Sequence, residues 1–261
     1  MDDARDDANP LETAPLPAPL ISGTPLVQPD GALSQAGVLH AYAIVARLKR
    51  RYPRDASLQQ LDTGAVVAHL QDLFAGADKV DIDVEEPAAV TVLAPSGDFP
   101  QALMGHARGL PRVDPCAVAV ASVLVSVLFF LLGFVSVGLS GSGRLTARVA
   151  PRIAPKLMQD LPRYRRLLAD LGGAGTKKEQ ARALFELLVV VGETGLVSAV
   201  VDVLYEELDS LALLTVVGGL ALQVAALVIA GPVGVAARIA NHGVAVADLV
   251  TKAQEAMVVC G

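Results

Sequence analysis

The sequence is short of aromatic residues, cysteine, histidine and charge. None of its 261 residues is Trp, aromatic residues make up 4%, and there are two Cys and four His. Charged residues make up 18% of the chain, against about 25% in an average soluble domain. Two cysteines exclude a disulfide-rich scaffold, and the net charge of −6 argues against a nucleic-acid partner. What remains is a chain that is 53% hydrophobic, with a mean hydropathy of +0.51.

Motifs for catalysis and cofactor binding are also missing. Cys116 and Cys260 lie too far apart for a metal knuckle, and the four His lack the spacing of paired ligands. The segment Gly138–Thr146 has the glycine gap of a phosphate-binding loop, but Arg144 and Leu145 replace the required Lys and Ser/Thr. We therefore expect no enzymatic activity, metal or cofactor. Cys116, at the edge of an apolar run, is interpreted as an acylation site or a buried, unreactive thiol.

The first thirty residues predict a disordered acidic tail. They contain six Pro and begin with four Asp among the first seven residues. A secretory signal needs a basic start followed by an apolar run, so no cleaved signal peptide is expected. Repeated proline also prevents a helix, because each one removes a backbone donor and restricts its neighbour. Residues 1–30 are thus assigned to a tail.

Residues 31–110 predict a small α+β head. Apolar residues at steps of three and four indicate helices at Leu33–Tyr52 and Ser57–Ala75. Alternation over Val80–Val84, followed by Val90–Val92, predicts a β-hairpin with one solvent-facing side. The acidic residues of the first strand lack the glycine turn of a calcium loop, which favours a solvated face. This head is the expected surface for a protein partner.

Two long uncharged runs dominate the rest of the chain. The first, Pro115–Gly143, has 29 residues without a charge, and within it Ala117–Leu139 is long enough to cross a bilayer core of roughly 30 Å as one helix. Its fifteen Val, Leu and Phe favour insertion by roughly 5–9 kcal/mol. A fully buried helix of a soluble protein is the alternative. The residues expected to insert are Leu124, Leu128, Phe129, Phe130, Leu131 and Leu132.

The second run, Ser210–Ala237, has 28 residues without a charge. Leu211–Gly231, the turn at Gly231–Pro232 and Val235–Val250 form a candidate helical hairpin, an arrangement used by helical pore-forming toxins as a class. Small residues and one amide lie on a single helical face, where they allow another helix to approach closely, either in a membrane or in a soluble helical bundle. This helix-packing face consists of Gly219, Gln223, Ala226 and Ala230.

A third apolar segment, residues 184–204, is ambiguous. Thr176 and Glu179 have the spacing of a capping box, which predicts that a helix starts there. Acidic residues then interrupt the apolar pattern, and acids at membrane depth cost a few kcal/mol each. If this helix spans the membrane, Glu193 is a candidate intramembrane proton or ion site; if the helix lies at the interface, Glu193 is solvated.

The charge is unevenly distributed. Residues 144–183 carry ten Lys or Arg and three Asp or Glu, a net charge of +7, between two acidic regions. If the apolar runs span, this basic band is expected on the cytoplasmic side; if insertion is conditional, the band contacts anionic lipid. The candidate headgroup ligands are Arg144, Arg148, Arg152, Arg163, Arg165 and Arg166.

These features predict a mainly α protein: a helical bundle with two or three long apolar, membrane-inserting helices and the small N-terminal α+β head. Residues 111–261 form the membrane-interacting domain. Three functions fit: a membrane-inserting, pore-forming or channel-like homo-oligomer; a membrane-embedded anchor or scaffold whose head binds a protein; and a soluble, self-assembling structural protein. The first two imply that the lipid bilayer is a partner and the membrane is the location.

Overall fold

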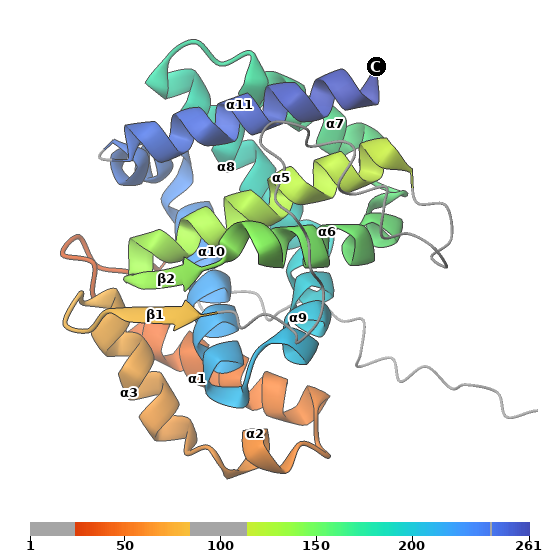
Figure 1. The fold of residues 1–261 in the computed structure, drawn as a ribbon. Coiled ribbons are helices and arrows are strands. Elements are labelled where there is room, and N and C mark those ends of the chain that lie inside the picture. Colours follow the sequence, from red (N-terminus) through yellow and green to blue (C-terminus); the bar gives the residue numbers. More distant parts are fainter. Residues whose placement is uncertain (1–23, 84–113, 241) are drawn as a thin grey trace, which may run out of the picture.

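The computed structural model describes residues 24–83, 114–240 and 242–261, and this part of the chain is mainly helical, as predicted (Figure 1). It contains two or three long apolar helices and a small two-stranded sheet. The helices of the N-terminal part are α1 (Gln35–Arg51), α2 (Ala56–Gln60) and α3 (Thr63–Phe74). The later helices are α5 (Pro115–Leu132), α6 (Ser142–Leu157), α7 (Leu161–Gly172), α8 (Lys177–Glu193), α9 (Leu196–Glu207), α10 (Ser210–Ile239) and α11 (Gly243–Cys260).

The N-terminal part begins before α1 and contains one more helix than predicted. Leu26 is buried, within the segment assigned to a tail, whereas residues 1–23 lie outside the described residues. A single helix was expected over Ser57–Ala75, but the chain breaks it into α2 and α3. The reason is Asp62, whose carboxylate accepts a hydrogen bond from the backbone N of Ala65 and caps a new helix.

The small sheet joins two distant parts of the chain. Strand β1 (Val80–Asp83) pairs in parallel with β2 (Val137–Ser140), so the partner of β1 comes from the end of the first apolar run. The second strand of the predicted hairpin, residues 90–92, lies outside the described residues. Gly138 makes the pairing with β1 possible, because a Cβ atom there would lie 1.9 Å from Oδ1 of Asp81.

The first apolar run is not one helix over Ala117–Leu139, so that expectation is wrong at its C-terminal end. Asp114 caps α5 by accepting from the backbone N of Cys116, and the helix ends at Leu132. A 3₁₀ turn, Gly133–Val135, follows, and Ser136 has a left-handed backbone with φ of 56°. This turn redirects the chain into β2, where backbone pairing with β1 replaces helical hydrogen bonds.

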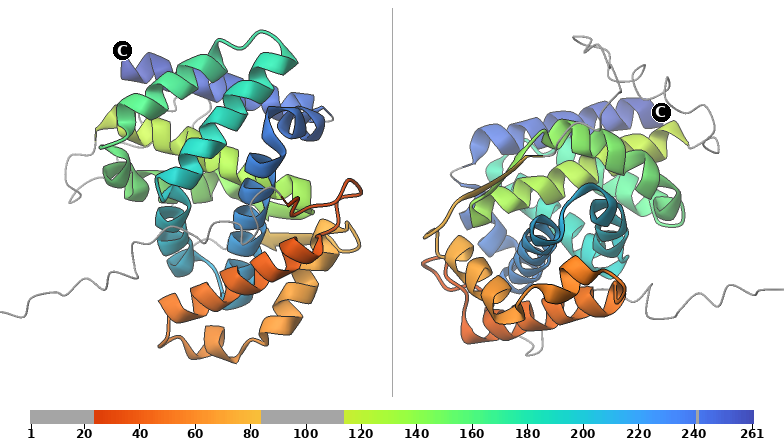
Figure 2. Two further views of the ribbon diagram at one scale, coloured as in Figure 1. Left: turned by 180° about the vertical axis from the view of Figure 1, so that it is seen from behind. Right: turned by 60° about the horizontal axis from the view of Figure 1, so that its bottom comes forward.

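α10 runs through the middle of the molecule, from the side of α1–α3 to the side of α11 (Figures 1 and 2). It contacts α1, α3, α5, α8 and α9. Asp209 caps its start, and Gly231, with φ of 68°, kinks it immediately before Pro232, where the turn was expected. The head packs directly on this helix, since the Leu70 side chain occupies the space that a Cβ atom on Gly218 would fill. A single hydrophobic core therefore includes residues of both the head and the later helices.

The second arm of the predicted hairpin is not a single helix. The segment Val235–Val250 is divided between the end of α10 and the start of α11, near His242. α11 packs on α5 and α7 and not along the first arm (Figure 2). At this corner the rings of Phe130 and Phe134 both face His242 edge-on, which helps to fix the turn between the two helices.

The third apolar segment forms two helices. The capping box at Thr176 and Glu179 is present, which confirms the predicted start of α8. Gly195, with φ of 69°, interrupts the helix, and the axes of α8 and α9 differ in direction by 74°. Only as a bent pair, therefore, do these two helices resemble a third span.

Candidate functional site

Two helices of the described residues are long and apolar enough to cross a membrane. They are Pro115–Val135, which combines α5 with the following turn, and Ser210–Ile239, which is α10. A 21-residue helix is about 31 Å long, close to the thickness of a bilayer core. Yet 67% of the most apolar window of the first and 78% of that of the second lie buried inside the protein. Both helices thus combine membrane length with burial against protein.

The residues predicted to insert all lie on α5, and most face the interior. Leu124, Leu128 and Leu132 are fully buried, and Leu131 and Phe129 are nearly so. Only the ring of Phe130 is partly exposed, against Phe134. Contact of these side chains with lipid therefore requires the helices that cover α5 to move.

The covering helices are amphipathic. α6, α7 and α11 pack around α5, while α1, α3, α8 and α9 pack around α10. On α6, for example, Leu145, Val149 and Ile153 are buried while Arg144 and Arg152 are exposed. Among the described residues, eight large apolar side chains are exposed: Leu39, Tyr42, Met158, Leu211, Val233, Val244, Val258 and Val259. Most large apolar side chains of the described residues are therefore buried inside the protein.

Three residues of the basic band, all on α6, pair with acidic residues of α9. Nη1 of Arg148 lies 2.6 Å from Oε2 of Glu207, and Arg152 pairs with both Glu206 and Glu207. On the same faces, Nζ of Lys156 lies 3.3 Å from Oδ2 of Asp202. We call this series of contacts the α6–α9 ion pairs. In this conformation the carboxylates of α9 neutralise these basic side chains of α6.

Asp202 is the centre of a second set of contacts, with α1. Its Oδ1 atom accepts from Nη2 of Arg51 at 2.6 Å and from the Tyr52 hydroxyl at 3.0 Å. The ring of Tyr52 stacks on that of Tyr205, with centroids 3.8 Å apart. Burial and the Asp202 carboxylate raise the pKa of Tyr52 well above its usual value. The end of α1 is thereby fixed to α9.

The other candidate headgroup ligands lie on α7 and at the start of α6. Arg163 pairs with Glu193 at 2.7 Å, and both side chains are about half exposed. Glu193 thus lies at the exposed end of α8, and its role as an intramembrane acid stays a prediction. Arg165 and Arg166 border a shallow hollow of about 330 Å³, and Arg165 donates to the carbonyl oxygen of Cys260. Arg144 is exposed at the start of α6.

The predicted helix-packing face of α10 is partly in use. A Cβ atom on Gly219 would lie 3.3 Å from Leu132, so the absence of a side chain allows α5 to approach. Gln223 is 1% exposed, and its Oε1 atom has no hydrogen-bond partner among the described residues. Ala226 is half-buried and Ala230 exposed. The second half of the face is therefore accessible to another helix.

His40 on α1 is a titratable side chain inside the apolar core. It is 1% exposed, and its Nδ1 atom lacks a hydrogen-bond partner among the described residues. Burial lowers the pKa of His40, because the charged imidazolium would lose its hydration.

Acidification should therefore destabilise the bundle through His40. An unfolded His titrates near pH 6.5, and the folded His40 titrates below that value. As the pH falls between these two pKa values the unfolded state binds the proton first, and the free energy of unfolding drops by at most about 1.4 kcal/mol per pH unit. Denaturant unfolding from pH 7.5 to 5 measures this decline, which should be weaker in His40→Gln. An unchanged decline in that variant would assign the effect to another group.

Several of these features were not predicted from the sequence. The α6–α9 ion pairs were not predicted, although basic residues recur every four positions on α6 and acidic residues lie on one face of α9. Cys116 was interpreted as an acylation site or a buried, unreactive thiol, but the structure joins it to Cys260 in a disulfide across 144 residues. Within the described residues no group of three His, Cys, Asp or Glu side chains forms a metal-binding set.

Comparison with protein-family models, curated proteins and solved structures finds no match.

Proposed function

We propose that this protein inserts conditionally into membranes, storing α5 and α10 inside a helical shell and releasing them into a bilayer to form a pore or channel. The observation that carries the proposal is the burial of two membrane-length helices that have no polar face. All 18 residues of α5 are uncharged. This helix is longer than the average helix of a soluble protein, which has about 11–12 residues. Its apolar side chains are compatible both with the hydrocarbon core of a bilayer and with the interior of a protein.

The surface of the described residues supports conditional insertion over permanent embedding. A permanently embedded protein exposes many large apolar side chains to lipid, whereas only eight are exposed among the described residues. Conversely, release of α5 and α10 exposes most of the present core. Such exposure is unfavourable in water but favourable in a bilayer.

The basic band supports an anionic membrane as the target. Each Lys or Arg near an anionic surface contributes about 1 kcal/mol of binding. The arginines of α6 and α7 lie on the helices that cover α5, so the lipid that attracts them would also receive the released helix. Their present partners, Glu206 and Glu207, would have to give way to lipid phosphate.

A second candidate function is a membrane anchor or scaffold whose head binds another protein. The observation in its favour is the pair Leu39 and Tyr42, which lie one turn apart on α1 and are 48% and 42% exposed. Large apolar side chains on one exposed helix face are typical of a protein contact. This function requires no release of contents from vesicles.

Purification without detergent, followed by vesicle assays, separates these functions. The proposed function expects a water-soluble protein that floats with anionic vesicles and releases an entrapped dye. A protein that needs detergent and never releases dye would be an anchor. A large soluble oligomer that does not float would instead be a self-assembling structural protein.

Ala226→Leu tests whether the pore assembles through the helix-packing face of α10. Ala226 is half-buried, so the folded bundle can accommodate Leu there, and the added apolar area should not weaken vesicle binding. In the membrane the larger side chain holds neighbouring helices apart, so dye release should fall while binding stays constant. Ala225→Leu is the matched control, because the adjacent residue points away from this face. Equal leakage from the two variants would exclude the face as the assembly contact.

A further inference from the structure

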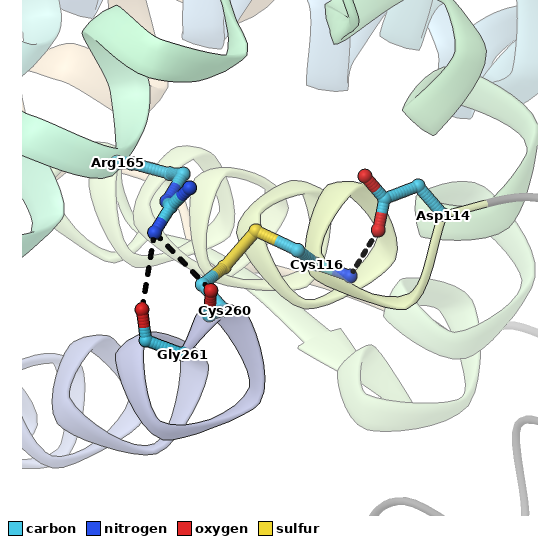
Figure 3. Close-up of a disulfide and its surroundings, with 5 residues drawn as sticks. All are labelled: Asp114, Cys116, Arg165, Cys260 and Gly261. Carbon is cyan, nitrogen blue, oxygen red and sulfur yellow. Dashed lines mark hydrogen bonds between the residues drawn. A yellow bond between two sulfur atoms is a disulfide. The ribbon is translucent and has the colours of Figure 1, made fainter.

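The disulfide joins the beginning of α5 to the end of α11. Cys116 is the second residue of α5, and Cys260 is the last residue of α11 (Figure 3). The two helices have 18 residues each, about 27 Å, and run side by side in opposite directions (Figure 1). α11 therefore packs over the membrane-length helix α5 along its length. The disulfide joins the two helices at the C-terminal end of α11.

α11 is attached non-covalently through a single apolar face, which packs on α5 and α7. Only four of its residues are buried, all of them apolar: Val246, Leu249, Ala253 and Ala256. Three hydrogen bonds add to these: Nε2 of Gln254 donates to the carbonyl oxygen of Gly172 at 2.6 Å, and Arg165 donates to the carbonyl oxygens of Cys260 at 3.1 Å and Gly261 at 3.4 Å. By comparison, thirteen residues of α5 are buried.

Both ends of α11 are tethered to helices that must enter the membrane. Its first residue, Gly243, follows α10 after three residues, and its last is bonded to α5. A segment tethered at both ends rebinds quickly, because its effective local concentration is high. With one tether removed, α11 is attached only to α10 and can swing away from α5.

We propose that the Cys116–Cys260 disulfide is a redox-sensitive lock that keeps α11 over α5, and that a dithiol reductant opens it. This inference rests on the proposed function. Cys260 is partly exposed, whereas Cys116 is buried, so the reductant attacks Sγ of Cys260. The Sγ–Sγ bond breaks, Cys116 leaves as a thiolate and takes up a proton, and a mixed disulfide forms with Cys260.

The second thiol of the reductant completes the exchange. It attacks the reductant's own sulfur in the mixed disulfide, which releases Cys260 as a thiolate that takes up a proton. The reductant leaves as a disulfide, and two electrons have passed to the two cysteines. α11 is then free to leave α5, which exposes to lipid the face of α5 that α11 had covered, while α6 and α7 still pack on the other faces.

The test compares three forms of the full chain: oxidised protein, protein treated with dithiothreitol, and the Cys116→Ser/Cys260→Ser variant. Hydrogen exchange of α11 amides and dye release from anionic vesicles are measured on each. Opening should speed the exchange of α11 at least tenfold, leave that of α8 unchanged, and raise dye release at least tenfold. The serine variant should leak without reductant and should not respond to it. As a control, a methylene thioacetal bridge between the two cysteines, which reductants do not cleave, should keep the protein closed.

The outcomes separate the lock from the proposed function. Equal α11 exchange in oxidised and reduced protein would overturn the lock, even if both forms release dye. Faster exchange of every helix after reduction would also overturn it, because the disulfide would then stabilise the whole fold. Faster α11 exchange without dye release from any form would support the lock as a conformational device and contradict the pore.

Discussion

An arginine in place of Ser126 should reduce insertion into vesicles about a hundredfold. Ser126 lies near the middle of the span Pro115–Val135, and in the folded bundle it is partly exposed. An arginine at the centre of a membrane helix costs about 3 kcal/mol on insertion scales, whereas at a partly exposed site its long side chain can reach water. The substitution should therefore spare the soluble bundle and penalise the inserted state. Vesicle flotation and dye release measure the loss, and thermal unfolding verifies the fold.

The choice of position decides what this experiment can show. Leu128 lies at a similar depth but is fully buried, so an arginine there would disrupt the bundle before any membrane is met. Met158→Arg is the matched control, since it adds the same charge at an exposed site outside both spans. Flotation of Ser126→Arg equal to that of Met158→Arg would contradict the insertion of α5.

The two apolar runs and the turn at Gly231–Pro232 were predicted from the sequence because their signals are local, whereas the capping residues of α5 and α10 were not identified. Asp114 and Asp209 cap α5 and α10 immediately before the first apolar residues, and Gly231–Pro232 marks the kink. The end of α5 was not readable, since residues 133–139 continue the apolar composition of the helix. The β1–β2 pairing decides that boundary, and it depends on Asp81 and Gly138, which are far apart in the sequence.

The contacts of the candidate site depend still more on the fold. The spacing of four residues on α6 predicts a basic face but not the partner of that face. Glu206 and Glu207 become its partners only because the bend at Gly195 turns α9 toward α6. In the same way, the folding of α11 across α5 brings the two cysteines together. Sequence thus predicted the charged and apolar surfaces, and the tertiary structure determined which of them are covered.

Neutralising the α9 carboxylates should strengthen binding to anionic vesicles about thirtyfold. The variant Glu206→Gln/Glu207→Gln removes the negative charges that pair with Arg148 and Arg152. Each released arginine contributes about 1 kcal/mol at an anionic surface, so the two together add about 2 kcal/mol. The bundle should remain folded, because exposed or partly exposed ion pairs contribute only about 0–1 kcal/mol each. Vesicle sedimentation at several phosphatidylglycerol contents measures the change in affinity.

A matched control separates local release from the change in net charge. Asp72→Asn/Glu255→Gln removes the same two negative charges at exposed sites on α3 and α11, away from the α6–α9 ion pairs. If release of the α6 arginines causes the effect, only Glu206→Gln/Glu207→Gln shows the full thirtyfold increase in affinity for anionic vesicles. This increase should become smaller at higher salt, which screens the arginines. Equal gains in both variants would mean that the protein responds to net charge alone, and α6 would lose its role as the docking helix. A gain confined to Glu206→Gln/Glu207→Gln would instead place the first lipid contact on the helix that covers α5, where binding and uncovering of the span are physically coupled.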